Sequence, residues 1–142
     1  MKKRAATRRP RRTKLTVGEV MTPSPVTIGM TTTLLAAHRT MTERRLRHVP
    51  VVEKGKLVGV LTERDLFFLE TIRGVDIEKD SVEDAMTPDA YAVSPHTPLA
   101  SVASTMARKR YGCAVVMAKG KVEGIFTTTD ALKMLAGLAR TS

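Results

Sequence analysis

Apolar and polar positions alternate along this chain with two different periods. Between Thr33 and Arg45, and again between Pro98 and Arg110, apolar residues recur every three or four positions, which is the period of an amphipathic helix. The recurring apolar residues are Leu34, Ala37 and Met41 in the first segment and Leu99, Val102 and Met106 in the second. Both segments end in basic residues, which suit the C-terminal end of a helix dipole. The pattern therefore predicts two helices of similar length.

Two short runs rich in β-branched residues follow each predicted helix. They are His48 to Val52 and Leu57 to Leu61, then Cys113 to Met117 and Val122 to Phe126. Each pair is joined around Lys-Gly, and because glycine tolerates a positive φ, this is typical of a β-hairpin. A brief extended segment precedes each helix, and a further helix is expected after each hairpin, following Thr62 and Thr127. Each half of the chain thus predicts a β-α-β-β-α unit.

The two halves are copies of each other. The segment from Val17 to Asp65 aligns without a gap on Val82 to Asp130, and about a third of the aligned positions are identical. Self-similarity at a fixed offset is the mark of an internal repeat. The chain then divides into a basic tail (1–14), a first repeat (15–73), a short polar linker (74–81) and a second repeat (82–140).

A unit of this kind exposes one apolar face of its sheet, and pairing two units buries both faces. The predicted fold class is therefore α/β (α+β), with two β-α-β-β-α repeats packed through their sheets with pseudo-two-fold symmetry. A length of 142 residues is sufficient for one compact core.

The charge changes this picture only at the N-terminus. The formal net charge is +10, and most of it lies in residues 1–14, which contain Lys and Arg but no acid. A block of like charge without apolar anchors is expected to be disordered alone. It could make weak, salt-sensitive contacts with nucleic acid, or serve only as a solubilising extension. No apolar run is long enough to span a bilayer, and we expect a cytoplasmic protein.

Residue types offer little for catalysis. His38, His48 and His96 are scattered, without the spacing of a metal site. Cys113 is the only cysteine, and a packed thiol is its expected role. We expect no catalytic residue, no metal ligand and no catalytic cofactor.

The repeated Thr-x-x-Asp after each hairpin, Thr62 to Asp65 and Thr127 to Asp130, has two interpretations. Threonine is a good helix N-cap, and an acid three residues later resembles a capping box. Alternatively, the aspartate accepts both hydroxyls of a ribose, while the threonine and the helix N-terminus favour a phosphate. The two roles can coexist.

The duplicated segments resemble a tandem pair of CBS domains (cystathionine β-synthase domains), also called a Bateman module. The resemblance rests on Met21-Thr22-Pro23 and Met86-Thr87-Pro88, on Arg47 to Val52, and on the segments Gly59 to Asp65 and Gly124 to Asp130. It implies clefts between the repeats that bind adenosine compounds such as AMP, ADP, ATP or S-adenosylmethionine. It also implies a homodimer and an effector protein that the sequence does not identify.

The resemblance further implies that the acid of each repeat faces the first strand and the pre-hairpin loop of the other. The first expected cleft combines Thr62, Arg64 and Asp65 with Tyr91, Ala92, Tyr111 and Gly112. The second combines Thr127, Thr129 and Asp130 with Val26, Thr27, Leu46, Arg47 and His48. Tyr111 could stack on adenine or pack in the core, and Arg64 could meet a phosphate or be solvated. Because the second repeat lacks the His and Pro of Arg47 to Val52, the sequence does not decide which cleft is occupied.

The sequence thus predicts a non-catalytic module that binds an adenosine nucleotide and signals by a change of conformation or oligomeric state. The alternative is a nucleic-acid-associated protein that acts through its basic tail, with the repeats as a dimerisation scaffold.

Overall fold

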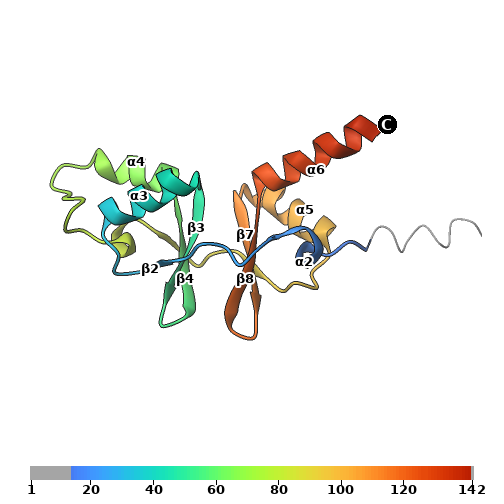
Figure 1. The fold of residues 1–142 in the computed structure, drawn as a ribbon, viewed down its shortest axis with the longest axis horizontal. Coiled ribbons are helices and arrows are strands. Elements are labelled where there is room, and N and C mark those ends of the chain that lie inside the picture. The colour runs from blue at the N-terminus through green and yellow to red at the C-terminus, as the bar shows by residue number, and fades with distance from the viewer. Residues whose placement is uncertain (1–13, 142) are drawn as a thin grey trace, which may run out of the picture.

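The computed structural model describes residues 14–141 and contains two four-stranded sheets that face each other, with helices on the outside (Figure 1). The predicted basic tail falls almost entirely outside the described residues. Elements follow in the order α2 (Val17–Val20), β1 (Thr22–Pro23), β2 (Ile28–Gly29), α3 (Leu34–Arg44), β3 (His48–Glu53), β4 (Lys56–Thr62), α4 (Glu63–Glu70), the 3-10 helix η2 (Val82–Asp84), β5 (Thr87–Pro88), β6 (Ala92–Val93), α5 (Leu99–Lys109), β7 (Cys113–Ala118), β8 (Lys121–Thr127) and α6 (Thr128–Thr141).

The predicted helices and hairpins are confirmed. In both hairpins the two turn residues have positive φ, 52° and 80° at Lys54 and Gly55, and 53° and 75° at Lys119 and Gly120. This backbone matches the twist of the flanking strands, and glycine adopts it without steric cost. The Lys-Gly pair therefore fixes the register in each repeat, with Glu53 opposite Lys56 and Ala118 opposite Lys121.

Each repeat contributes one two-residue strand to the sheet of the other. The sheet orders are β2-β3-β4-β5 and β1-β8-β7-β6, so β1 of the first repeat pairs with β8, and β5 of the second repeat pairs with β4. Val17 of α2 is likewise buried in the core of the second repeat, and Val82 of η2 in the core of the first. Each packed half therefore contains the Met-Thr-Pro segment of the other repeat.

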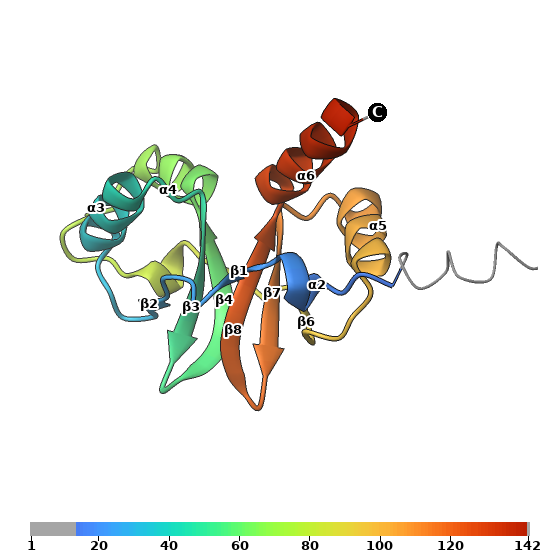
Figure 2. The ribbon, with the colours of Figure 1, turned by 45° about the vertical axis from the view of Figure 1, so that its right-hand side comes forward.

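A third apolar cluster joins the two sheets. Val60 of β4 packs with Cys113 and Val115 of β7 and with Ile125 of β8, and all four are buried. Figure 2 shows the hairpins of the two repeats side by side, with α3 and α4 beyond one sheet and α5 and α6 beyond the other. The predicted packing of two repeats through their sheets is confirmed.

The outer helices break the symmetry. In the first repeat α4 lies against α3, where His38 Nδ1 is 3.4 Å from Glu70 Oε2. The equivalent positions in the second repeat hold Ala103 and Leu135, which cannot form this pair. In Figure 1, α6 extends away from the body of the protein.

Candidate functional site

Thr62 and Thr127 each begin a helix with the same pair of hydrogen bonds. The Thr62 N–H donates to Asp65 Oδ2 over 3.1 Å, and the Asp65 N–H donates to Thr62 Oγ1 over 3.0 Å. At Asp130 and Thr127 the corresponding distances are 2.9 and 3.1 Å. Both aspartates are half-buried and both have the capping role. Since these bonds use Oδ2, and no hydrogen bond to Oδ1 of either aspartate occurs within residues 14–141, each carboxylate retains an oxygen for a ligand.

Each helix start is also tied to the beginning of its own hairpin. The Glu63 N–H donates to the Arg47 carbonyl, and the Thr128 N–H donates to the Gly112 carbonyl, both over 3.0 Å. The sequence repeat therefore places Asp65 and Asp130 at equivalent points, each beside the boundary between the two sheets.

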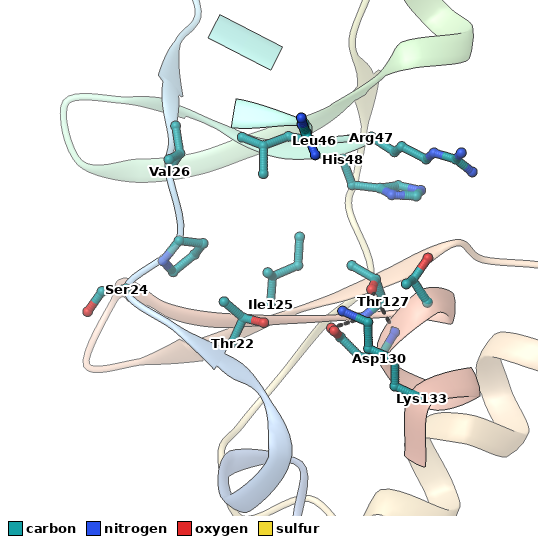
Figure 3. Close-up of a pocket in the computed structure, with 13 residues that line it drawn as sticks. Thr22, Ser24, Val26, Leu46, Arg47, His48, Ile125, Thr127, Asp130 and Lys133 are labelled. Carbon is teal, nitrogen blue, oxygen red and sulfur yellow. Dashed lines mark hydrogen bonds between the residues drawn. The ribbon is translucent and has the colours of Figure 1, made fainter. Parts of the chain in front are cut away.

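Asp130 opens onto a cavity of about 580 Å³, which we call the Asp130 cleft. One part of its lining is apolar, and another is the start of α6. The apolar residues are Pro25, Val26, Leu46 and Ile125, and the α6 start contributes Thr127, Thr129 and Asp130. Figure 3 shows Val26 and Leu46 opposite Ile125, and His48 opposite Thr127. The cleft thus has an apolar region beside a carboxylate at a helix N-terminus.

Basic residues also line the Asp130 cleft, besides Thr22 and Ser24. Arg45 and Arg47 come from the segment between α3 and β3, His48 is the first residue of β3, and Lys133 comes from α6. Burial, and next the charge of Arg47, lower the pKa of His48 below its ordinary value of 6.5, against a smaller opposing effect of Asp65. His48 is therefore mainly neutral at pH 7, and the permanent positive charge comes from the two arginines and the lysine.

Asp65 lines a second cavity, the Asp65 cleft, also of about 580 Å³. Its predicted members Thr62, Arg64, Asp65 and Gly112 come together there. The other residues that line it are Arg47, His48, Glu63, Phe67 and Arg110. This cleft lacks the aliphatic wall of the Asp130 cleft.

Three residues expected at Asp65 lie elsewhere. Tyr111 lines a separate groove between α5 and α6 and packs on Tyr91, with ring centroids 5.2 Å apart. Ala92 lies on β6 beside the hairpin turn of the first repeat. Within the Asp65 cleft, the imidazole of His48 lies against Gly112, at the place a side chain on that residue would occupy. His48 thus takes up space directly beside the backbone neighbour of Tyr111.

The Asp130 cleft brings together all but one of its predicted residues. Thr27 is exposed and does not line the cavity. Sequence reasoning missed Arg45 and Lys133, although both carried a signal. Arg45 is identical to Arg110 in the repeat alignment, and Lys133 lies about one helical turn after Asp130, on the same face.

Comparison with known proteins assigns the family. The family model "CBS domain" matches residues 17–70 and 82–137, most of the chain. The chain belongs to the CBS domain family. It is a tandem CBS pair, the arrangement called a Bateman module, as its sequence predicts.

Several relatives are similar over nearly the whole pair. Protein MJ1225 of Methanocaldococcus jannaschii is 28% identical over 120 residues, which cover 84% of this chain but 42% of that protein. YhcV of Bacillus subtilis is 26% identical over 114 residues, covering 80% of this chain and 81% of YhcV. The chain thus spans less than half of some relatives it matches.

Solved structures share the fold of this CBS pair. AcuB of Vibrio cholerae superposes with a TM-score of 0.79 at 31% identity, covering 88% of this chain and 93% of AcuB. CBSX2, solved in complex with AMP, has a TM-score of 0.74 at 25% identity, covering 87% of this chain and 98% of CBSX2.

The described part of the CBS pair contains neither a membrane-spanning helix nor a cluster of metal-binding side chains. Within residues 14–141, no helix has the length and apolar character needed to cross a bilayer. The same residues contain no cluster of three or more His, Cys, Asp or Glu side chains placed to hold a metal ion.

Proposed function

We propose that this CBS pair is a non-catalytic regulatory module and that the Asp130 cleft is its principal site for an adenosine nucleotide. The observation that carries the proposal is the combination in one cavity of a half-bonded carboxylate, an apolar wall and basic side chains. The complex of CBSX2 with AMP supports the ligand class.

Each part of the cleft suits one part of a nucleotide. Asp130 Oδ1 accepts hydrogen bonds from the two ribose hydroxyls, while Oδ2 keeps the N-cap of α6. Val26, Leu46 and Ile125 cover the faces of the base, since apolar burial is the main driving force for binding a flat ring. Arg47 and the N-terminal end of α6 stabilise the phosphate.

Asp65→Ala is a matched control for Asp130→Ala. Each substitution removes the equivalent hydrogen bond, from the threonine N–H to the aspartate Oδ2, and keeps the bond from its own backbone N–H to the threonine hydroxyl. We expect each to destabilise the protein by about 1 kcal/mol. They differ in the cleft that they alter. Ligand at a hundredfold excess over its Kd adds about 2.7 kcal/mol to the free energy of unfolding, so the melting temperature reports binding.

We expect AMP, ADP or ATP to raise the melting temperature of the wild type and of Asp65→Ala, but not that of Asp130→Ala. Isothermal titration calorimetry on the same variants gives the stoichiometry. A full response in Asp130→Ala, or no response of the wild type to any adenine nucleotide, would contradict the proposal.

We also propose that the signalling form is a homodimer. The supporting observation is a set of exposed apolar side chains on α4 and α6, namely Phe67, Phe68, Leu132 and Leu135. Light scattering coupled to size exclusion tests this, and Phe68→Glu combined with Leu135→Glu is expected to give monomers. A monomeric wild type would exclude it.

A further inference from the structure

The lining of the Asp130 cleft has more cations than carboxylates. Three permanently charged groups, Arg45, Arg47 and Lys133, line it together with one carboxylate, Asp130. The Asp65 cleft also has three such cations but faces them with two carboxylates, Glu63 and Asp65. Asp130 keeps its negative charge when it accepts ribose hydroxyls, so the lining of its cleft has two more cations than carboxylates, against one more in the Asp65 cleft.

We propose that the Asp130 cleft selects its ligand by phosphate number. It binds ADP and ATP more tightly than AMP, and it binds S-adenosylmethionine, whose sulfonium is cationic, more weakly than AMP. Arg45 and Lys133 determine this selectivity. The inference rests on the proposed function of the cleft and specifies the class of nucleotide.

The backbone of Arg45 points to a role for its side chain. Arg45 terminates α3 in the left-handed conformation, with φ 55° and ψ 47°, and its N–H donates to the carbonyls of Met41 and Thr42. Glycine is the usual residue here, because a Cβ is unfavourable at positive φ. An arginine at such a position has a backbone cost, and Arg45 lines the Asp130 cleft. A residue in a sparsely populated conformation at a cavity suggests a functional constraint.

The second repeat has the same arrangement. Arg110 ends α5 with φ 61° and ψ 38° and lines the Asp65 cleft. Both helices thus end in an arginine with a left-handed backbone, and each arginine lines the cleft that contains the acid of the other repeat.

Lys133 brings positive charge from the other side of the Asp130 cleft. It lies on α6 about one turn after Asp130 and next to it in Figure 3, across the cleft from Arg47 and His48. Its counterpart in α4 is Phe68, which is exposed. Phosphates that extend from a ribose on Asp130 thus pass between cations of both repeats, and each further phosphate adds charge-assisted contacts.

The test is calorimetric titration with AMP, ADP, ATP and S-adenosylmethionine, with EDTA present so that the phosphates retain their full charge. We expect the wild type to bind ATP at least about tenfold more tightly than AMP, because one charge-assisted contact contributes about that factor. The difference shrinks at high salt. S-adenosylmethionine is expected to bind more weakly than AMP.

Arg45→Gly and Lys133→Gln remove the charge. Glycine suits the left-handed position, so Arg45→Gly leaves the fold intact. We expect each variant to lose about tenfold in ATP affinity but less than about threefold in AMP affinity. Arg110→Gly is the matched control, because it makes the same backbone change at the Asp65 cleft and leaves the ratio of ATP to AMP affinity unchanged.

The outcomes separate this inference from the function on which it rests. Equal affinity of the wild type for ATP and AMP overturns phosphate selection and leaves nucleotide binding intact. Failure of all four ligands to bind overturns both. An ATP to AMP ratio that survives in Arg45→Gly and Lys133→Gln, or that falls equally in Arg110→Gly, shows that Arg45 and Lys133 do not determine selectivity.

Discussion

Gly59 and Gly124 occupy equivalent positions in the two repeats, and the structure predicts that alanine is tolerated differently at each. A Cβ on Gly59 would lie 2.6 Å from the Thr87 carbonyl oxygen and 3.0 Å from Met86 Sδ. Thr87 belongs to β5, the short strand from the other repeat that pairs with β4 beside Gly59. The new methyl therefore meets backbone, and β5 has to move away from the sheet to which it is hydrogen-bonded.

The three atoms nearest to a Cβ on Gly124 all belong to the Met21 side chain: Sδ is the closest, followed by Cγ at 2.8 Å and Cε at 3.0 Å. Methionine has three rotatable bonds and adapts to such a change. Overpacking that shifts backbone costs about 1–3 kcal/mol, so we expect Gly59→Ala to lose stability in that range and Gly124→Ala to lose less than about 1 kcal/mol. For a protein of this size the difference is about 3 °C or more in melting temperature.

Urea unfolding followed by far-ultraviolet circular dichroism suits this comparison, because the protein contains no tryptophan. The two variants have the same chemical change, so any effect of alanine on the unfolded chain cancels between them. A loss at Gly124→Ala equal to or larger than that at Gly59→Ala would refute the argument that the exchanged strand β5 is held tightly against β4.

Three further predictions concern single side chains. Because the pKa of His48 is lowered in the folded protein, the unfolded chain binds more protons on acidification. The free energy of unfolding is therefore expected to decline as the pH falls below about 6.5. In urea titrations at stepped pH, His48→Gln should make the free energy of unfolding depend less steeply on pH. Burial raises the pKa of the Cys113 thiol to about 11. Iodoacetamide at pH 8 is therefore expected to label Cys113 in urea but not in the native protein. Rapid labelling of the native protein would show that the interface between the sheets opens. Arg45→Gly is expected to melt at the same temperature as the wild type or slightly higher, since glycine relieves the left-handed backbone; a clear loss of stability would mean that the arginine has a structural role.

Most of the fold could be predicted because its signals are local. The Lys-Gly turns, the helical spacing in α3 and α5 and the Thr-x-x-Asp helix starts are each decided within a few residues. The exchange of β1 and β5 between repeats could not be predicted. A two-residue strand has no periodicity of its own, and its partner lies about a hundred residues away in the case of β1 and β8.

The candidate site was predictable to the extent that the repeat determines it. Asp130, Arg47 and His48 meet as expected, because the helix start of one packed copy faces the segment before the hairpin of the other. The Asp65 side departs from expectation at Gly112, where the absence of a side chain lets His48 enter from the other repeat. Such a contact depends on both repeats at once, and neither segment alone contains the information. The left-handed backbone of Arg45 was equally invisible, because arginine normally favours helix interiors.

The exchanged strands also explain how a ligand could change the relation between the two halves. Residues 24–27 run from β1, on the sheet of the second repeat, to β2, on the sheet of the first. Ser24, Pro25 and Val26 of this crossing line the Asp130 cleft. Under the proposed function, a nucleotide held by Asp130 would contact α6 of one packed half, the Arg45–His48 segment of the other, and the segment that connects them. A ligand shifts the conformational equilibrium of a protein only if its contacts differ between the conformations. Lys133 and Arg45 belong to different packed halves, so their separation changes when the halves rotate against each other. A ligand that contacts both residues therefore favours one relative orientation of the halves.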